Sequence, residues 1–330
     1  MALIQPPPSS YIQASQKMWF TYSTSSNEFQ HGLLGITASY IVGNLCFQFP
    51  ESEPLKAKQI EVIIKGTEYV QWKTRRGKTT TTYTYKRQLI HQSLLLWESK
   101  SLKEDPYEDI TKANFPFQFL LPNDLPQSMN LGTGRIYYKV KAKILRKSNF
   151  MKLQGSEKNI KCNCLIKRYS PLPRPAPVQW TEWDDPNALN RGLSYDISMD
   201  YDTFGPGNPI VVKFVVKLLK MDLNVKEIFI GLKEYHLFRA GGGKKSSKRY
   251  VQRISIFGNQ LRTMLNNVWS HTCKMDVPID DVKWTTNRDN INVRHQVKIK
   301  IKFGLFGPKN INLKREVNIA NISNITEVYQ

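Results

Sequence analysis

The chain has 330 residues, with 48 Lys and Arg against 27 Asp and Glu, and its formal net charge at pH 7 is +21. Apolar residues make up 40% and aromatic residues 11%, which excludes an entirely disordered chain, and the length indicates about two domains. Four cysteines exclude a disulfide-stapled scaffold, and residues 1–8 lack the charged and apolar regions of a secretory signal, so we expect an intracellular protein.

Strands are predicted along the whole chain, because apolar residues recur at every second position. Ile136, Tyr138 and Val140 alternate with Lys139 and Lys141, which is typical of a strand with one buried and one exposed face. The predicted strands span residues 60–65, 79–85, 117–121, 135–144, 195–201, 210–219, 228–232 and 297–303. A weak helical periodicity is confined to residues 260–268. The predicted fold class is all-β, with two tandem antiparallel immunoglobulin-like β-sandwiches.

A proline-rich segment marks the boundary between the two predicted sandwiches. Pro171, Pro173, Pro175 and Pro177 force an extended, semi-rigid connector that a central strand cannot contain. The expected organisation is a flexible N-terminus (1–17), a first domain (18–170), the connector (171–178), a second domain (179–320) and a short tail (321–330).

A short apolar segment lies between Pro116 and Pro122, which fix the backbone at both of its ends. Leu120 and Leu121 are adjacent, and two adjacent side chains cannot both point inward in a regular strand. We therefore expect a β-bulge or a strand end at these leucines.

The residue patterns for catalysis, cofactors and metals are incomplete. Residues 241–246, Gly-Gly-Gly-Lys-Lys-Ser, lack the first glycine and the Ser or Thr of a phosphate-binding P-loop, so we interpret them as a basic hairpin tip. The three aspartates of residues 196–202 lack the glycine and distal glutamate of a calcium loop. Cys162 and Cys164 share one strand face without a second ligand pair and are interpreted as buried structural thiols. We predict a binding protein, not an enzyme, with no catalytic residue, cofactor or metal site.

Five segments carry a family likeness. They are residues 41–45 with 54–66; residues 115–128, with Phe-Pro-Phe and two Leu-Pro pairs; residues 134–142; residues 225–234, ending in Leu-Lys-Glu; and residues 291–299, with His295 near the centre. In this order they resemble the arrestin family, and the α-arrestins in particular, over about residues 18–320. The resemblance implies an arrestin N-domain followed by an arrestin C-domain, and it implies that the first strand pair ends at Gly66.

The resemblance also implies a function. Typical α-arrestins are adaptors that bind cytosolic tails of membrane cargo, recruit a ubiquitin ligase and direct the cargo into endocytosis or sorting. Recruitment uses Pro-Pro-x-Tyr motifs, which dock in polyproline form to WW domains of the ligase. The nearest match here, residues 7–11, has one residue too many between proline and tyrosine. We therefore expect cargo binding and leave ligase recruitment open.

Three groups of bases are the candidate binding residues. They are a predicted turn with Lys73, Arg75, Arg76 and Lys78; a strand ridge with Lys139, Lys141, Lys143 and Arg146; and a glycine-rich loop with Lys244, Lys245, Lys248 and Arg249. Exposed Lys and Arg bind phosphate groups, either on a phosphorylated tail or on anionic lipids. The alternative interpretation of each group is solvated surface that protects strand edges from aggregation.

The predicted function is that of a cytoplasmic adaptor, peripheral at the plasma membrane or endosomes. It binds phosphorylated or acidic tails of receptors and transporters for endocytosis, sorting or ubiquitination. The alternative is an arrestin-fold coat or sorting-complex scaffold without a ubiquitin-ligase role. A basic nucleic-acid-binding protein is a less favoured alternative, because the sequence has no zinc finger, helix-turn-helix signature or aromatic RNA-binding motif.

Overall fold

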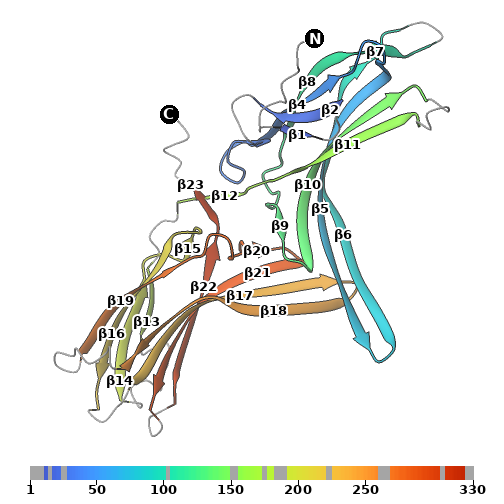
Figure 1. Cartoon of the computed structure of the whole chain (residues 1–330). Helices are drawn as coiled ribbons and strands as arrows, with labels where there is room; N and C mark the ends of the chain where they lie inside the picture. Colours follow the sequence, from blue (N-terminus) through green and yellow to red (C-terminus); the bar gives the residue numbers. More distant parts are fainter. Residues whose placement is uncertain are drawn as a thin grey trace. The chain divides into compact units, whose positions relative to one another are not determined.

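A computed structural model describes residues 11–13, 17–23, 28–101, 105–148, 155–172, 177–181, 192–220, 225–258, 268–304 and 309–323. These residues form strands and no α-helix, so the predicted all-β class with two β-sandwiches is confirmed (Figure 1). Within the same residues, no helix has the length and apolar character needed to cross a bilayer. The chain divides into a first unit, Met1–Arg168, and a second unit, Tyr169–Gln330.

The first unit contains two sheets. One sheet has the order β1-β2-β4-β3, with β8 paired to β4. Its strands are β1 (Tyr11–Gln13), β2 (Met18–Tyr22), β3 (Gln30–His31), β4 (Tyr40–Gln48) and β8 (Lys112–Leu120). The expected flexible N-terminus therefore contains a strand, since β1 pairs with β2. The strand end predicted at the paired leucines is confirmed, because β8 ends at Leu120, which is exposed, and Leu121 is buried.

The other sheet of the first unit has the order β11-β10-β5-β6, with β7 on β5 and β9 on β10. Its strands are β5 (Leu55–Arg76), β6 (Thr79–Glu98), β7 (Glu108–Ile110), β9 (Met129–Asn130), β10 (Gly134–Arg146) and β11 (Glu157–Cys164). β10 pairs with β5 only as far as Val70, and after a hydrogen bond from the Gln71 amide to the Thr133 carbonyl, residues 72–76 pair with β6 alone. The result is a two-stranded ribbon at the end of the sheet (Figure 1).

The strand expected to end at Gly66 continues to Arg76. Gly66 marks a β-bulge between β5 and β6, not a terminus. A Cβ atom at this position would lie 2.5 Å from the ring of Tyr138, which is buried and donates a hydrogen bond to the Pro126 carbonyl. Only glycine leaves room for that ring.

Gly66→Ala is expected to lower the free energy of unfolding by about 1–3 kcal/mol, because the added methyl group must displace a buried aromatic ring. Urea unfolding of both proteins measures the difference. Gly155→Ala is the control, since a Cβ there meets no atom within 4 Å, and its effect is expected to stay within about 0.5 kcal/mol. Equal effects of the two substitutions would contradict the packing argument.

The second unit is also a sandwich. One sheet has the order β13-β14-β16-β19, and the other has the order β15-β22-β21-β17-β18, with β20 on β21. The strands are β13 (Val178–Thr181), β14 (Leu193–Met199), β15 (Thr203–Phe204), β16 (Pro209–Leu218), β17 (Val225–Ala240), β18 (Gly243–Phe257), β19 (Val268–Asp276), β20 (Thr286–Asn287), β21 (Ile291–Phe303) and β22 (Ile311–Ile319). Among the described strands of this unit, neighbours pair antiparallel, with two exceptions. β15 pairs in parallel with β22, and β12 (Tyr169–Pro171) pairs in parallel with β23 (Asn321–Ser323).

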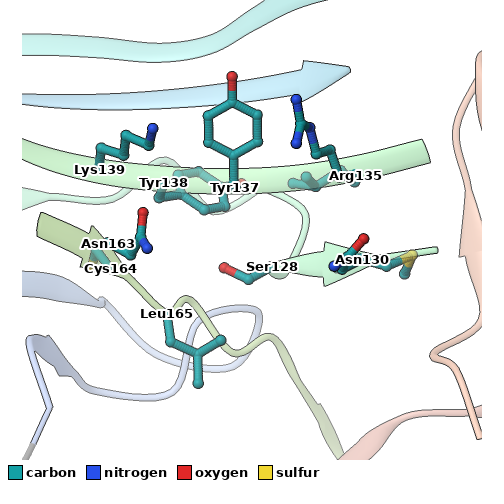
Figure 2. A pocket seen from close by; sticks show the side chains of 11 residues that line it. Ser128, Asn130, Arg135, Tyr137, Tyr138, Lys139, Asn163, Cys164 and Leu165 are labelled. Atoms are coloured by element: carbon teal, nitrogen blue, oxygen red, sulfur yellow. The ribbon is translucent and has the colours of Figure 1, made fainter. Parts of the chain in front are cut away.

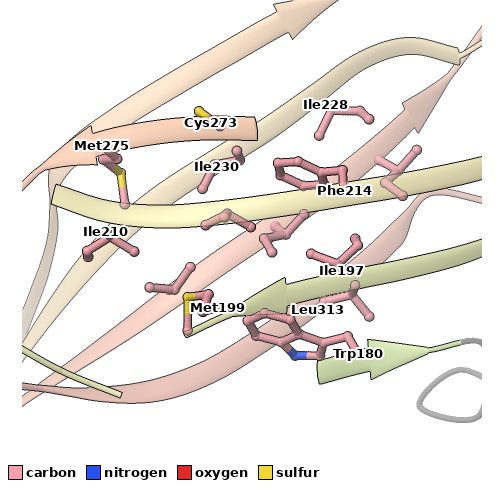
Figure 3. Close-up of a cluster of buried hydrophobic side chains, with 14 of the residues drawn as sticks. Trp180, Ile197, Met199, Ile210, Phe214, Ile228, Ile230, Cys273, Met275 and Leu313 are labelled. Atoms are coloured by element: carbon pink, nitrogen blue, oxygen red, sulfur yellow. The ribbon is translucent and has the colours of Figure 1, made fainter. Parts of the chain in front are cut away.

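Alternate residues of both sheets form the core of the second unit (Figure 3). Phe214 of β16 is fully buried and lies 6.2 Å from Trp269, centroid to centroid. Trp180 covers one side of the cluster and donates a hydrogen bond from Nε1 to the Lys314 carbonyl at 3.4 Å. Burial of about 25 cal/mol per Å² of apolar surface makes such a cluster the main source of stability.

The limits of the second unit differ from the sequence expectation. β12 (Tyr169–Pro171) pairs in parallel with β23 (Asn321–Ser323), so the unit includes the first residues assigned to the tail. The first unit ends at Arg168, two positions before the predicted end of the first domain, and the second unit begins at Tyr169. Residues 173–176 of the predicted connector lie outside the described residues, as does the weak helical segment, except that Val268 begins β19.

Candidate anion-binding surfaces

The exposed face of the sheet β11-β10-β5-β6 is strongly basic. Strand pairing places Lys65 of β5 opposite Lys139 of β10 and His91 of β6, and it places Lys141 opposite Lys161 of β11. Alternate residues on the same side complete the surface, which we call the N-face. Its bases are Lys65, Lys73, Arg75, Lys86, Arg135, Lys139, Lys141, Lys143 and Lys161, and its acids are Glu61, Glu98 and Glu157.

A groove of about 660 Å³ runs over the N-face, and its walls include lysines from all four strands. Lys141 and Lys143 lie 4.0 and 3.7 Å from the carboxylate of Glu157. Within the described part of the chain, Lys65, Lys86 and Lys161 have no ion pair. Ion pairs this exposed contribute about 0–1 kcal/mol, so Lys141 and Lys143 can exchange Glu157 for an anionic ligand, and the other three lysines need break no ion pair.

A second hollow of about 460 Å³ adjoins the groove, and the two share Tyr137 and Lys139 in their linings (Figure 2). Arg135 and Lys139 lie on either side of the Tyr137 ring, 5.5 and 5.2 Å from its centroid. Ser128 and Asn163 contribute polar groups to the same hollow. Arg135 was not among the residues predicted from the sequence, because it stands apart from the lysine ridge.

The predicted turn group divides between two surfaces. Lys73 and Arg75 continue the outward row of β5 beyond the end of β10. They lie on the same side of the sheet as the lysines of β10 and therefore belong to the N-face. Arg76 pairs with Thr79 on the opposite row, and Lys78 lies in the turn that follows Gly77. The structure therefore brings two of the four residues together with the ridge on one surface.

Arg146 does not belong to the ridge in which it was placed. Strand alternation places Arg146 on the row opposite to Lys139, Lys141 and Lys143, and its Nε donates a hydrogen bond to the Gly155 carbonyl at 3.0 Å. It lines a separate pocket of about 490 Å³ with Lys158 and Lys17. Burial lowers the pKa of Lys158, and the neighbouring cations Arg146 and Lys17 make a smaller contribution in the same direction.

The glycine-rich loop forms a tight hairpin, as interpreted from the sequence. Gly241 and Gly242 have φ of +52° and +77°, which two-residue hairpin turns of the primed type require. Lys244 and Lys248 lie on the outward row of β18, and Lys245 lies on the opposite row, across from Phe238. The loop lysines thus do not share a single surface.

Arg249 is a correction to the predicted binding group. Its Nε donates to Glu234 at 2.9 Å, and its other nitrogens donate to Asp281, to Oδ1 at 2.6 Å and to the backbone carbonyl. Because its guanidinium is held by two carboxylates, we assign Arg249 to the internal packing of the second unit and remove it from the anion-binding set.

Glu234 is the centre of a buried polar network and has no exposed surface. Its Oε1 accepts hydrogen bonds from His236 Nε2 at 2.8 Å and from Arg249. Its Oε2 accepts from the Lys283 amide at 2.8 Å and lies 3.3 Å from His295 Nε2. Burial alone would raise the pKa of Glu234, but these donors outweigh it and hold the pKa well below its usual range.

The same network fastens the segment between β19 and β21 to the sheet. Asp281 is held by Arg249, and Lys283 by Glu234. Thr285 Oγ1 accepts from the Ile319 amide at 2.8 Å and lies 3.0 Å from the second ring nitrogen of His295. His295, quoted for its place in the family pattern, is therefore a structural residue of the second unit.

The second unit has its own basic face on β18-β17-β21-β22, which we call the C-face. Its bases are Lys233, Arg239, Lys244, Lys248, Arg253, Arg294, Lys298, Lys300, Lys302 and Lys314, and its acids are Glu227 and Glu316. Tyr250 lies between Lys233 and Arg253, at 5.1 and 4.9 Å from its ring centroid. The alternating lysines of residues 298–302 were visible in the sequence, whereas the cation–aromatic contacts require the fold.

The cysteines are free thiols, as interpreted from the sequence. Cys162 and Cys164 are buried, and burial raises the pKa of Cys162 to about 12 and that of Cys164 further. Raised pKa values disfavour the thiolate that metal binding and nucleophilic attack require. Across the described ranges, no three His, Cys, Asp or Glu side chains are grouped as metal ligands.

Comparison with known families agrees with this architecture. Residues 40–167 match the N-terminal domain of arrestin (or S-antigen), and residues 190–324 match its C-terminal domain. A search of curated proteins finds no match. The two domain matches follow one another in the order of the two sandwiches and cover most of both units. The chain belongs to the arrestin family.

Proposed function

We propose that this arrestin-family protein is an adaptor of the α-arrestin kind, which binds phosphorylated or acidic cytosolic tails of membrane cargo on its N-face. The bound cargo is directed into endocytosis, sorting or ubiquitination. The observation that carries the proposal is the excess of bases on one exposed sheet face, nine bases against three carboxylates. Such a field attracts an acidic peptide and accelerates its association.

The geometry of the N-face favours an extended ligand. Lysines on one strand row are about 7 Å apart, and neighbouring strands are about 5 Å apart, so the surface presents a grid of positive charge. The groove supplies a concave path across this grid. An extended tail with acidic or phosphorylated side chains places its negative charges at comparable intervals.

A second candidate partner is the anionic surface of a membrane. The C-face supports it, since Lys233, Arg253 and Lys298 present positive charge beside exposed parts of aromatic rings. Each base near a charged membrane surface contributes about 1 kcal/mol. A peripheral position at the plasma membrane or endosomes belongs to this proposal.

The remaining alternatives differ in their partners. An arrestin-fold coat or sorting scaffold binds other coat proteins and no ligase, whereas a ubiquitin adaptor requires a WW-domain ligase. A nucleic-acid-binding protein would use the same positive charge to bind the phosphate backbone. Its affinity for DNA or RNA would fall steeply with salt concentration, whatever the nucleotide sequence.

Proximity labelling with the full chain in its native cell tests the proposal. Recovery of receptors or transporters is expected, and a WW-domain ligase among them distinguishes the ubiquitin adaptor from the scaffold. Recovery of ribosomal or chromatin proteins without membrane cargo would contradict the proposal and favour nucleic-acid binding.

A further inference from the structure

The far end of the β5–β6 pair is a ribbon of two strands, residues 72–83, which we call the turn ribbon (Figure 1). Among the described residues, each of its strands pairs only with the other, because β10 pairs with β5 no further than Val70. Residues 73–82 are all exposed, and Trp72 and Tyr83 stack at the base of the ribbon, 5.0 Å between ring centroids. A hairpin without a third strand is marginally stable in water, so we expect the exposed part to open while its base stays packed.

Two bases of this turn that lie off the N-face precede a run of threonines. Arg76, Gly77 and Lys78 lead directly into four consecutive threonines, Thr79–Thr82. Of these four, only Thr79 has an arginine three positions before it. Protein kinases discriminate substrates by charge patterns, and an arginine at this distance from the acceptor is one such pattern, bound by carboxylates of the kinase. The sequence of the exposed ribbon therefore favours Thr79 as an acceptor.

The strand register supplies a partner for a phosphate on Thr79. Thr79 pairs directly with Arg76, and the Cβ atoms of such a pair lie about 5 Å apart. Within the described residues, Arg76 has no ion pair, whereas Arg75 already donates from Nε to the Gly77 carbonyl at 3.2 Å. A phosphate adds three strong acceptor oxygens and a charge of about −1.5 to −2, so it can accept charge-assisted hydrogen bonds from the guanidinium across the ribbon.

We propose that Thr79 is a phosphorylation site for a protein kinase that recognises an arginine three positions before its acceptor. ATP is the phosphoryl donor. The Thr79 hydroxyl oxygen forms a bond to the γ-phosphorus, the bond from that phosphorus to the β–γ bridging oxygen breaks, and ADP leaves, while the hydroxyl proton passes to the catalytic aspartate of the kinase. The phosphothreonine then pairs with Arg76 and holds the ribbon closed. The site goes beyond the proposed function, because Thr79 and Arg76 lie on the row opposite to the N-face.

Phosphorylation of the full chain by a purified arginine-directed Ser/Thr kinase tests the site, with the modified residue mapped by mass spectrometry. Thr79 is expected to be the main site, and Thr79→Val is expected to lower the initial rate at least about tenfold. Thr82→Val is the matched control, since no arginine stands three positions before Thr82, and it is expected to change the rate by less than about twofold. Both variants keep a β-branched residue, so the strand is expected to stay formed.

The part played by the arginine is measured with Arg76→Gln. This variant is expected to lower kcat/KM of the kinase for the chain at least about tenfold, because it removes a charge-assisted contact. Arg315→Gln removes the same charge from an exposed arginine of the second unit and is expected to change kcat/KM by less than about twofold. Equal losses would mean that the kinase responds to total charge and would overturn the assignment.

Two further results would overturn the proposal. The first is a phosphate mapped mainly to Thr80, Thr81 or Thr82 in the wild-type chain. The second is phosphorylation of a synthetic peptide of residues 70–86 without phosphorylation of the full chain, which would show that the ribbon does not open to the kinase.

Hydrogen exchange of residues 72–83 measures the closing of the ribbon. Phosphorylation is expected to slow exchange of these amides at least about threefold in the wild-type chain. The same phosphate, introduced into Arg76→Gln by prolonged incubation with the kinase, is expected to leave the exchange rates within about twofold of the unmodified variant. Equal slowing in both chains would overturn the pairing of phosphothreonine with Arg76.

Discussion

Glu234→Ala is expected to lower the free energy of unfolding of the second unit by about 3–5 kcal/mol, because it removes one partner of a buried charge network. The variant leaves the Arg249 guanidinium, two imidazole groups and the Lys283 amide without their shared acceptor. Hydrogen exchange in peptides from β17 and β21 reports on this unit selectively and measures the loss.

Glu316→Ala is the matched control for this prediction. Glu316 is also a glutamate on a strand of the second unit, but its side chain is 65% exposed and lies 3.7 Å from Arg294. Its removal is expected to cost less than about 1 kcal/mol. Equal losses in both variants would contradict the role assigned to Glu234.

The network also predicts a dependence on pH. Because the pKa of Glu234 is depressed in the folded state, the unfolded chain takes up a proton that the folded chain does not. The stabilisation is complete above about pH 5 and is lost as the pH falls below about 4.3. The difference in stability between the wild-type protein and Glu234→Gln is therefore expected to shrink in acid, and a difference that grows in acid would refute the assignment.

Reversing the charge of three groove lysines is expected to have the second large effect, a loss of affinity for acidic peptides. The variant Lys65→Glu, Lys86→Glu, Lys161→Glu is expected to weaken binding of an acidic phosphopeptide by at least about 100-fold, because each reversal replaces an attraction with a repulsion. Fluorescence anisotropy measures the affinity. All three residues are exposed, so the fold is expected to stay intact.

The control for this variant carries the same change in net charge at other exposed lysines. These are Lys112, Lys217 and Lys274, which lie outside both basic faces. Their reversal to glutamate is expected to weaken binding by less than about tenfold, through the long-range field alone. An equal loss in both variants would mean that total charge, not the N-face, binds the peptide.

The sequence allows the basic rows to be predicted wherever a strand is regular. Lys139, Lys141 and Lys143 alternate with buried residues in β10, and the same alternation in β21 exposes Lys298 and Lys300. Period-two reasoning needs only the local pattern, and it succeeds in both strands.

The same reasoning fails where rows shift or partners are distant in sequence. A β-bulge between Leu232 and Lys233 precedes the pairing of Glu234 with Arg249. Glu234 and His295 are 61 residues apart, so their contact cannot be predicted from a local sequence pattern. The extension of β5 beyond Gly66 departs from the end that the family resemblance implied, and the contact of Gly66 with the buried ring of Tyr138 joins residues 72 positions apart, which no local pattern shows.

Buried and basic residues alternate along β10, so substitutions and single-residue insertions in this strand have different consequences. Ile136, Tyr138 and Val140 are buried in the core of the first unit, and the residues between them lie on the exposed face. Point substitutions at Arg135, Tyr137 or Lys139 can therefore change the charge and shape of this face without disturbing the core. Insertion of a single residue would exchange the two rows, burying lysines and exposing the apolar side chains. The exposed face can therefore change by substitution, whereas an inserted residue would disturb the core unless a β-bulge absorbed it.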